Sequence, residues 1–122
     1  MISKVTGIGF IASGTTSGAV SCPSGTPTAV GSITLTPGKW IITAYIDWQS
    51  NANGVRQLSW ASGVNPARQY TVTTSAAANK EVYQQHVRIV STTGETFTFY
   101  GYQDSGSTIN AYPYVQAIKI SE

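Results

Sequence analysis

The sequence contains little charge. Charged residues make up 10% of its 122 residues, against about 25% in a typical soluble domain. Lys and Arg exceed Asp and Glu by only two, seven against five, and they are scattered along the chain. So small and dispersed an excess does not build the basic patch that nucleic acids require. We therefore expect no nucleic-acid partner.

Cysteines and long apolar runs are also scarce. Cys22 is the only cysteine, which excludes an intrachain disulfide and a thiolate metal site. No apolar run approaches the roughly 20 residues of a membrane-spanning helix, and the apolar segment 8–12 is too short for the core of a signal peptide. We expect no membrane insertion. We expect synthesis in the cytoplasm, which would suit a virion protein released by lysis.

Catalytic and metal-binding groups are few. His86 is the only histidine, and without a Gly-x-Ser-x-Gly motif it gives a serine triad little support, so we expect a surface or interface histidine. A glycosidase needs two positioned carboxylates, for which Asp47 and Asp104 are the nearest candidates. Segment 104–107 offers a calcium ion only one carboxylate. We expect no enzymatic activity, no metal and no cofactor.

What the sequence does contain is a long run of β-branched and aromatic residues. Turn residues Pro37 and Gly38 precede it, so a strand is predicted over 39–49. Side chains alternate between the two faces of a strand. One face is apolar throughout and is predicted to face the core: Trp40, Ile42, Ala44, Ile46 and Trp48. On the other face, Ile41 and Tyr45 are expected to lie under another layer or against a neighbouring subunit.

Further segments with strand composition alternate with turn signals. The predicted strands are 1–12, 28–36, 39–49, 55–61, 69–74, 81–90, 96–102 and 111–120. Residues 13–27 are predicted to form a loop with a short strand at 19–21, and the Asn53-Gly54 pair is predicted to join 39–49 and 55–61 as an antiparallel hairpin. About eight antiparallel strands without helical periodicity predict an all-β jelly-roll sandwich, with one domain over residues 1–122.

Several of these strands carry apolar or aromatic residues on both faces. In 81–90, Tyr83, Val87 and Ile89 share one face, opposite a polar row that includes His86. In 96–102, Phe97 and Phe99 are predicted to face inward. A two-sheet monomer of this size cannot bury all of these apolar side chains, and such a surplus indicates an interface between subunits.

Three segments together carry a resemblance to a known family: Leu35-Thr36-Pro37-Gly38-Lys39-Trp40, Thr96-Phe97-Thr98-Phe99-Tyr100-Gly101-Tyr102 and Val115-Gln116-Ala117-Ile118-Lys119-Ile120. Their order resembles the C-terminal head domains of bacteriophage tail fibres and receptor-binding proteins, which have C1q/TNF-like jelly-roll folds. The resemblance implies a homotrimer, attached to the rest of a tail fibre in the virion, that recognises a host cell-surface saccharide without catalysis. The alternative is a purely structural trimerisation cap or virion decoration protein without a ligand.

The family has no fixed binding motif, so candidate ligand-binding residues come from chemistry alone. Saccharides stack their C–H faces on aromatic rings and pair their hydroxyls with amides and carboxylates. Trp48 continues the core face and is assigned to the core, whereas Trp60 fits an interface and a sugar-stacking role equally well. The predicted ligand-binding residues are Tyr100, Tyr102, Gln103, Asp104, Trp60 and Asn53.

Overall fold

Strands alone make up the regular structure in the computed structural model, which describes residues 8–16, 18–62, 70–78 and 80–122. Their bounds are β1 Ile11–Ser13, β2 Thr15–Thr16, β3 Val20–Cys22, β4 Thr28–Leu35, β5 Gly38–Trp48, β6 Val55–Ser62, β7 Tyr70–Ser75, β8 Val82–Thr92, β9 Glu95–Gln103 and β10 Ile109–Ser121. The predicted strands from 28–36 onward are confirmed to within two residues at the ends that the structure describes. Of the predicted strand 1–12, residues 1–7 lie outside the described part, as does the start of the predicted strand 69–74.

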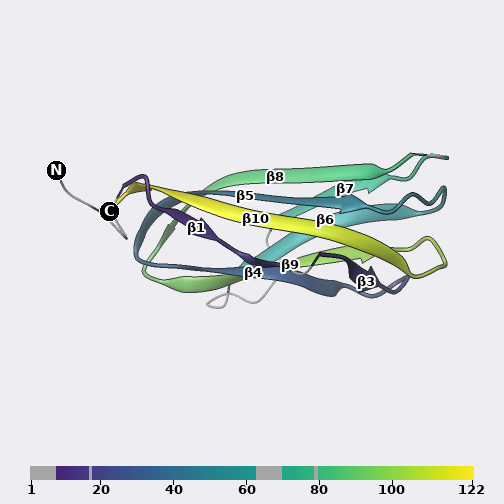
Figure 1. Ribbon diagram of the computed structural model, residues 1–122, viewed down its shortest axis with the longest axis horizontal. Coiled ribbons are helices and arrows are strands. Elements are labelled where there is room, and N and C mark those ends of the chain that lie inside the picture. Colours follow the sequence, from purple (N-terminus) through teal and green to yellow (C-terminus); the bar gives the residue numbers. More distant parts are fainter. Residues whose placement is uncertain (1–7, 17, 63–69, 79) are drawn as a thin grey trace.

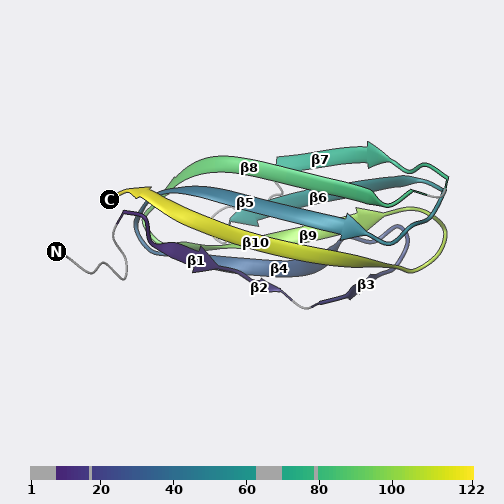
Figure 2. The ribbon, with the colours of Figure 1, turned by 45° about the horizontal axis from the view of Figure 1, so that its top comes forward.

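The strands form two antiparallel sheets packed face to face (Figures 1 and 2). Sheet A has the order β1-β10-β5-β8, with β3 also paired to β10, and sheet B has the order β2-β4-β9-β6-β7. This arrangement confirms the predicted all-β jelly roll.

The first strand of the jelly roll is divided into three pieces, which is why more strands are present than the predicted eight. β1 and β3 pair with β10 of sheet A, whereas β2 between them pairs with β4 of sheet B. The chain leaves sheet A at Gly14, where a Cβ would collide with Val115 Cγ1 and lie 2.8 Å from the Ser32 carbonyl oxygen. Glycine is therefore required for this crossing. The short strand predicted at 19–21 is β3, and the predicted loop 13–27 also contains β2, which was not predicted.

The core is built on the predicted inward face of β5. Trp40, Ile42, Ala44, Ile46 and Trp48 are each at most 2% exposed. Phe97 and Phe99 of β9 meet them from sheet B, as predicted. The Trp48 indole fits because the facing residue is Gly101, where a Cβ would lie 2.9 Å from the ring.

The predicted hairpin between β5 and β6 is wrong. β5 pairs with β10 and β8 in sheet A, whereas β6 pairs with β9 and β7 in sheet B. Gly54 does adopt the positive φ, 77°, that an Asn-Gly pair favours. Here the positive φ of Gly54 belongs to a connection that crosses from sheet A to sheet B. β5 and β6 do not pair with each other, because the strands that pair with them all come later in the chain.

β8 places its polar face inside the sandwich. Gln84 is 1% exposed, and its side chain joins both sheets. Its Oε1 accepts a hydrogen bond from Trp48 Nε1 at 2.8 Å, and its Nε2 donates to the carbonyls of Arg56 at 2.8 Å and Val72 at 3.0 Å. The apolar face of β8 consequently points to solvent.

The sandwich has two distinct ends. At one end the first described residues meet the C-terminus, because Gly9 N donates to the Lys119 carbonyl at 2.7 Å. The other end, which we call the tip, is formed by the connections β3–β4, β5–β6, β7–β8 and β9–β10 (Figure 1). Loops at the tip therefore lie far from the C-terminus.

Candidate functional site

The structure brings three of the predicted ligand-binding residues together at the tip. Asn53 comes from the β5–β6 connection, whereas Tyr102 and Asp104 come from the end of β9. Val55 N donates to Asp104 Oδ1 at 2.6 Å, which holds the two segments together. Gln57 lies opposite Tyr102 in the ladder between β6 and β9. We call Asn53, Gln57, Tyr102 and Asp104 the tip corner.

A buried arginine fixes the backbone under the tip corner. Arg56 is fully buried, and its guanidinium donates to the carbonyls of Asn51 at 3.0 Å, Asn53 at 2.9 Å and Val55 at 3.1 Å. Burial lowers the pKa of Arg56, and the nearby Asp104 carboxylate opposes this shift by raising it. The arginine thus holds the exposed Asn53 in a fixed position.

Gln103 does not face a ligand, so its prediction is corrected. Its side chain is fully buried. The amide nitrogen donates to the carbonyls of Cys22 at 2.8 Å and Ser107 at 2.6 Å, and its oxygen accepts from Ser105 N at 2.8 Å. Gln103 therefore ties the tip loops to one another and is not available to a saccharide.

Trp60 is corrected for the same reason. It is 1% exposed, because its position on β6 faces the interior. Its ring stacks on Phe99 at a centroid distance of 5.2 Å, and its Nε1 donates to His86 Nδ1 at 2.9 Å. A side chain enclosed in this way cannot stack on a sugar or contact a neighbouring subunit.

Tyr100 lies beside the tip corner on the outward face of sheet B. It is half-buried, and its ladder partners are Ala29 of β4 and Ser59 of β6. This face is rich in hydroxyl and amide groups, and its described strand positions carry no charge. Its exposed or half-buried members include Ser32, Thr34, Gln57, Thr71, Thr73, Thr98, Tyr100 and Tyr102.

His86 is half-buried between the sheets, not a surface or interface residue as expected. Burial, and then the neighbouring Arg88, lower its pKa. The neutral ring is also the form that accepts the hydrogen bond from Trp60. The folded protein therefore binds a proton at His86 less readily than the unfolded chain does.

A pH dependence of stability follows from this lowered pKa. Neutral His86 contributes to the stability of the folded protein at pH values above its pKa in the unfolded chain, about 6.5. This contribution is lost as the pH falls through that value toward the lower pKa of His86 in the folded protein. We expect the thermal midpoint of the wild type to fall more between about pH 7 and pH 5 than that of His86→Asn, whose Oδ1 accepts the same bond without titrating. Equal losses in both proteins would contradict this role for His86.

A second candidate surface covers the outward side of sheet A. Seven large hydrophobic residues there are 39% to 61% exposed: Ile11, Tyr83, Val87, Ile89, Tyr112, Tyr114 and Ile118. Ile41 and Tyr45 of β5 point the same way and are half-buried. We call these nine residues, together with Thr43, Asp47, Gln85 and Gln116 between them, the assembly face.

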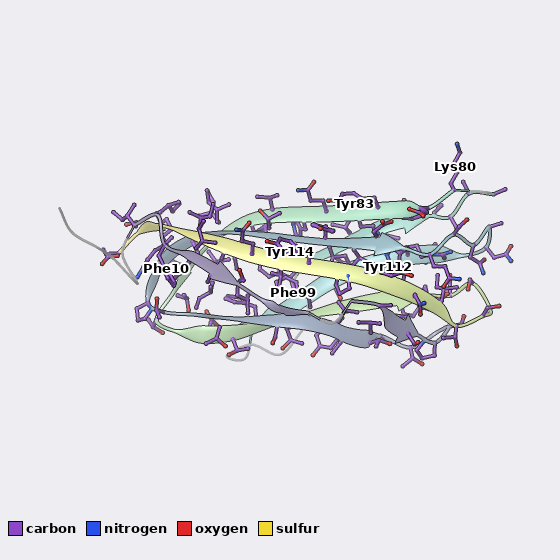
Figure 3. All side chains as sticks on the ribbon, in the orientation of Figure 1. Phe10, Lys80, Tyr83, Phe99, Tyr112 and Tyr114 are labelled. Carbon is purple, nitrogen blue, oxygen red and sulfur yellow. The ribbon has the colours of Figure 1, made fainter. Side chains whose placement is uncertain are left out.

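The assembly face is ordered in bands across the strands. Ile11, Ile118, Ile41 and Ile89 are successive ladder partners and form one row across four strands. The tyrosines gather toward the tip, where Tyr45 contacts Tyr83 and Tyr114 at centroid distances of 5.1 Å and 5.3 Å. Figure 3 labels Tyr83 on β8 and Tyr112 and Tyr114 on β10. Burial, and then Tyr45 and Asp47, raise the pKa of Tyr83.

Sequence reasoning found only part of this face. It predicted that Ile41 and Tyr45 lie against another layer or subunit, and the structure places no layer of the described chain over them. The exposure of Tyr112, Tyr114 and Ile118 was missed, although their positions two and four residues apart in one strand were a signal.

The candidate carboxylates for catalysis do not converge. Asp47 points outward from sheet A, whereas Asp104 lies at the tip edge of sheet B. Within the described residues, no group of three or more His, Cys, Asp or Glu side chains is placed to hold a metal ion.

No helix in that part of the chain is long and apolar enough to cross a membrane. A hollow of about 410 Å³ lies at the end opposite the tip, where Lys39, Thr92 and Glu122 are among its lining residues.

Known structures share this fold at low sequence identity. Eiger TNF from S. frugiperda has a TM-score of 0.63 and 10% identity, covering 96% of this chain and 94% of that one. A chain of infectious bursal disease virus, Gx strain, has a TM-score of 0.60 and 8% identity, with 88% of this chain and 31% of that chain covered. A chain from the disulfide-linked pili of Bacillus endospore appendages has a TM-score of 0.52 and 10% identity, covering 99% and 98%.

These similarities establish a TNF-like jelly roll. No family model matches the chain, and no curated protein matches it in sequence.

Proposed function

We propose that this chain is the non-enzymatic, homotrimeric receptor-recognition head of a bacteriophage tail fibre, made in the host cytoplasm and carried on the virion tail. The observation that carries the proposal is the assembly face, a continuous set of exposed aliphatic and aromatic side chains. Monomeric proteins rarely expose a patch of this kind.

Two further copies of the same chain are the occupants that this face fits best. Its described residues between Lys39 and Asp47 of β5 are neutral, so copies can approach without like-charge repulsion across most of the surface. If the copies associate with their tips pointing the same way, the isoleucine row of one copy would lie against that of the next, and tyrosines against tyrosines. The first described residues of all copies would then lie at one end and all tips at the other, as attachment of a C-terminal head to a fibre shaft requires.

Saccharide recognition is proposed for the tip corner. Asn53 and Gln57 offer amides, Asp104 a carboxylate and Tyr102 a ring and a hydroxyl, the groups that pair with sugar hydroxyls and C–H faces. A tip corner on each of three subunits would bind a cell surface multivalently, so weak single sites would combine into high avidity.

A purely structural trimerisation cap or decoration protein is the second candidate. The burial of Trp60 and Gln103 favours it, since only four of the six predicted ligand-binding side chains remain accessible. The two candidates share the assembly face and differ only at the tip corner.

Two measurements test the proposal. Light scattering at several concentrations is expected to give a mass near three times 12.9 kDa, and a monomer throughout would reject it. A glycan array with the wild type is then expected to show binding that Asn53→Ala and Tyr102→Ala each weaken about 10-fold, as loss of one amide or aromatic contact worth about 1.4 kcal/mol does. Thr34→Ala, on the same sheet but remote from the tip, is the matched control. A trimer that binds no glycan would favour the structural cap.

A further inference from the structure

Asp104 presents one open carboxylate oxygen at the tip corner. The residue is exposed and directly follows β9. Its Oδ1 accepts from Val55 N at 2.6 Å, which fixes the orientation of the carboxylate. Its Oδ2 meets no donor within the described part of the chain. Because an ionised carboxylate only accepts hydrogen bonds, Asp104 keeps a fixed acceptor for the hydroxyls of a ligand.

The other three members of the tip corner carry no formal charge. Asn53 is exposed, whereas Gln57 and Tyr102 are half-buried ladder partners on adjacent strands. Thr73 of β7 is exposed and continues this row beyond Gln57. Amide and hydroxyl groups both donate and accept hydrogen bonds. Asp104 is therefore the one charged member of the tip corner.

The cation next to Asp104 is out of reach of a ligand. Burial lowers the pKa of Arg56, and the Asp104 carboxylate opposes this shift, as a neighbouring opposite charge does. Arg56 is fully buried, and its two terminal nitrogens donate to backbone carbonyls. Its Nε is also buried, without a hydrogen-bond partner among the described residues. The guanidinium therefore offers no donor at the surface.

The remaining described cations are placed elsewhere. Three lie roughly 20 Å or more along their strands from the tip: Lys39 on β5, Arg88 on β8 and Lys119 on β10.

Lys80 does belong to the tip, in the connection directly before β8. Figure 3 shows its side chain projecting away from the sandwich on the side of β8, whereas Asp104 follows β9 of the other sheet. The acidic Glu81 comes next in the chain. A ligand on the tip corner thus meets Asp104 without an accessible cation beside it.

This arrangement of charge treats neutral and acidic saccharides differently. A neutral saccharide brings hydroxyls that can donate to Asp104 Oδ2 and pair with the amides of Asn53 and Gln57. A saccharide that ends in a uronic acid brings a second carboxylate in place of a hydroxymethyl group. Two like charges at contact distance repel when no cation lies between them.

We propose that the tip corner selects neutral saccharides and rejects acidic ones, and that Asp104 decides between the two. This selectivity rests on the proposed saccharide recognition and adds to it the class of ligand and the residue that determines the class.

A glycan array built from matched pairs tests this selectivity. Each pair consists of a neutral glycan ending in glucose or galactose and the same glycan ending in the corresponding uronic acid. The wild type is expected to bind the neutral member at least ~10-fold more tightly. Asp104→Asn keeps an oxygen for Val55 N and is expected to bind both members about equally. The control Glu81→Gln removes a carboxylate elsewhere at the tip and is expected to keep the wild-type preference.

The outcomes separate this selectivity from the proposed function. A wild type that binds both members equally, or prefers the acidic one, overturns the selectivity and leaves saccharide recognition standing. A preference that persists in Asp104→Asn, with its fold checked by circular dichroism, overturns the role of Asp104. A wild type that binds no glycan of either kind rejects saccharide recognition and the selectivity together.

Discussion

Gln84→Leu is expected to lower the free energy of unfolding by about 3 to 5 kcal/mol. The substitution nearly preserves the side-chain volume but removes the amide that joins the two sheets. Trp48 Nε1 loses its acceptor, and the carbonyls of Arg56 and Val72 lose a donor. Each buried polar group left unsatisfied costs about 1 to 3 kcal/mol, so a single substitution should remove a large part of the stability of a domain this size.

Denaturant unfolding monitored by tryptophan fluorescence measures this change. Gln85→Leu is the matched control, because the adjacent glutamine makes the same chemical change on the exposed side of β8. It is expected to alter stability by no more than about 0.5 kcal/mol. If the two variants lose the same amount, Gln84 does not link the sheets energetically.

Ile118→Glu is expected to convert the proposed trimer to a monomer of 12.9 kDa. Ile118 lies in the isoleucine row between Ile11 of β1 and Ile41 of β5, and its side chain is 40% exposed in the subunit. Association would bury the new carboxylate without a cation, which costs several kcal/mol per chain. The isolated subunit should still fold, because the side chain points away from the core.

Light scattering measures the mass of this variant, and circular dichroism checks its fold. Thr73→Glu is the control, because it adds the same charge to the outward face of sheet B. It is expected to remain trimeric. A trimeric Ile118→Glu would place the subunit contact elsewhere, whereas a folded monomer beside a trimeric control supports the assembly face.

Most of the fold could be predicted from the sequence, because apolar and polar residues alternate along single strands. β5 shows this most clearly, since every second residue from Trp40 to Trp48 is apolar and every one of these side chains is buried. The same period places Phe97 and Phe99 inside. Extended to the end of β9 it also places Gln103 inside, so a signal for the correction of Gln103 was present.

Polar residues inside the sandwich were harder to predict. Arg56, Gln84 and His86 are residue types usually found at the surface, because burying such groups is costly unless a partner is found. Their partners are backbone carbonyls and a tryptophan from strands distant in sequence. No local pattern contains that information. The sequence therefore did not predict that the polar side of β8 faces the interior, or that Tyr83, Val87 and Ile89 consequently face solvent.

The sequence by itself determined the all-β class, most strand boundaries and the surplus of apolar side chains, since these depend on residue type and a period of two. Only the tertiary structure decided that β5 and β6 lie in different sheets and that Trp60 and Gln103 are enclosed. It also gathered Asn53, Tyr102 and Asp104 at one corner and set four isoleucines in a row. Strand pairing and the choice of the inward face depend on contacts between residues far apart in the chain, which no local pattern specifies.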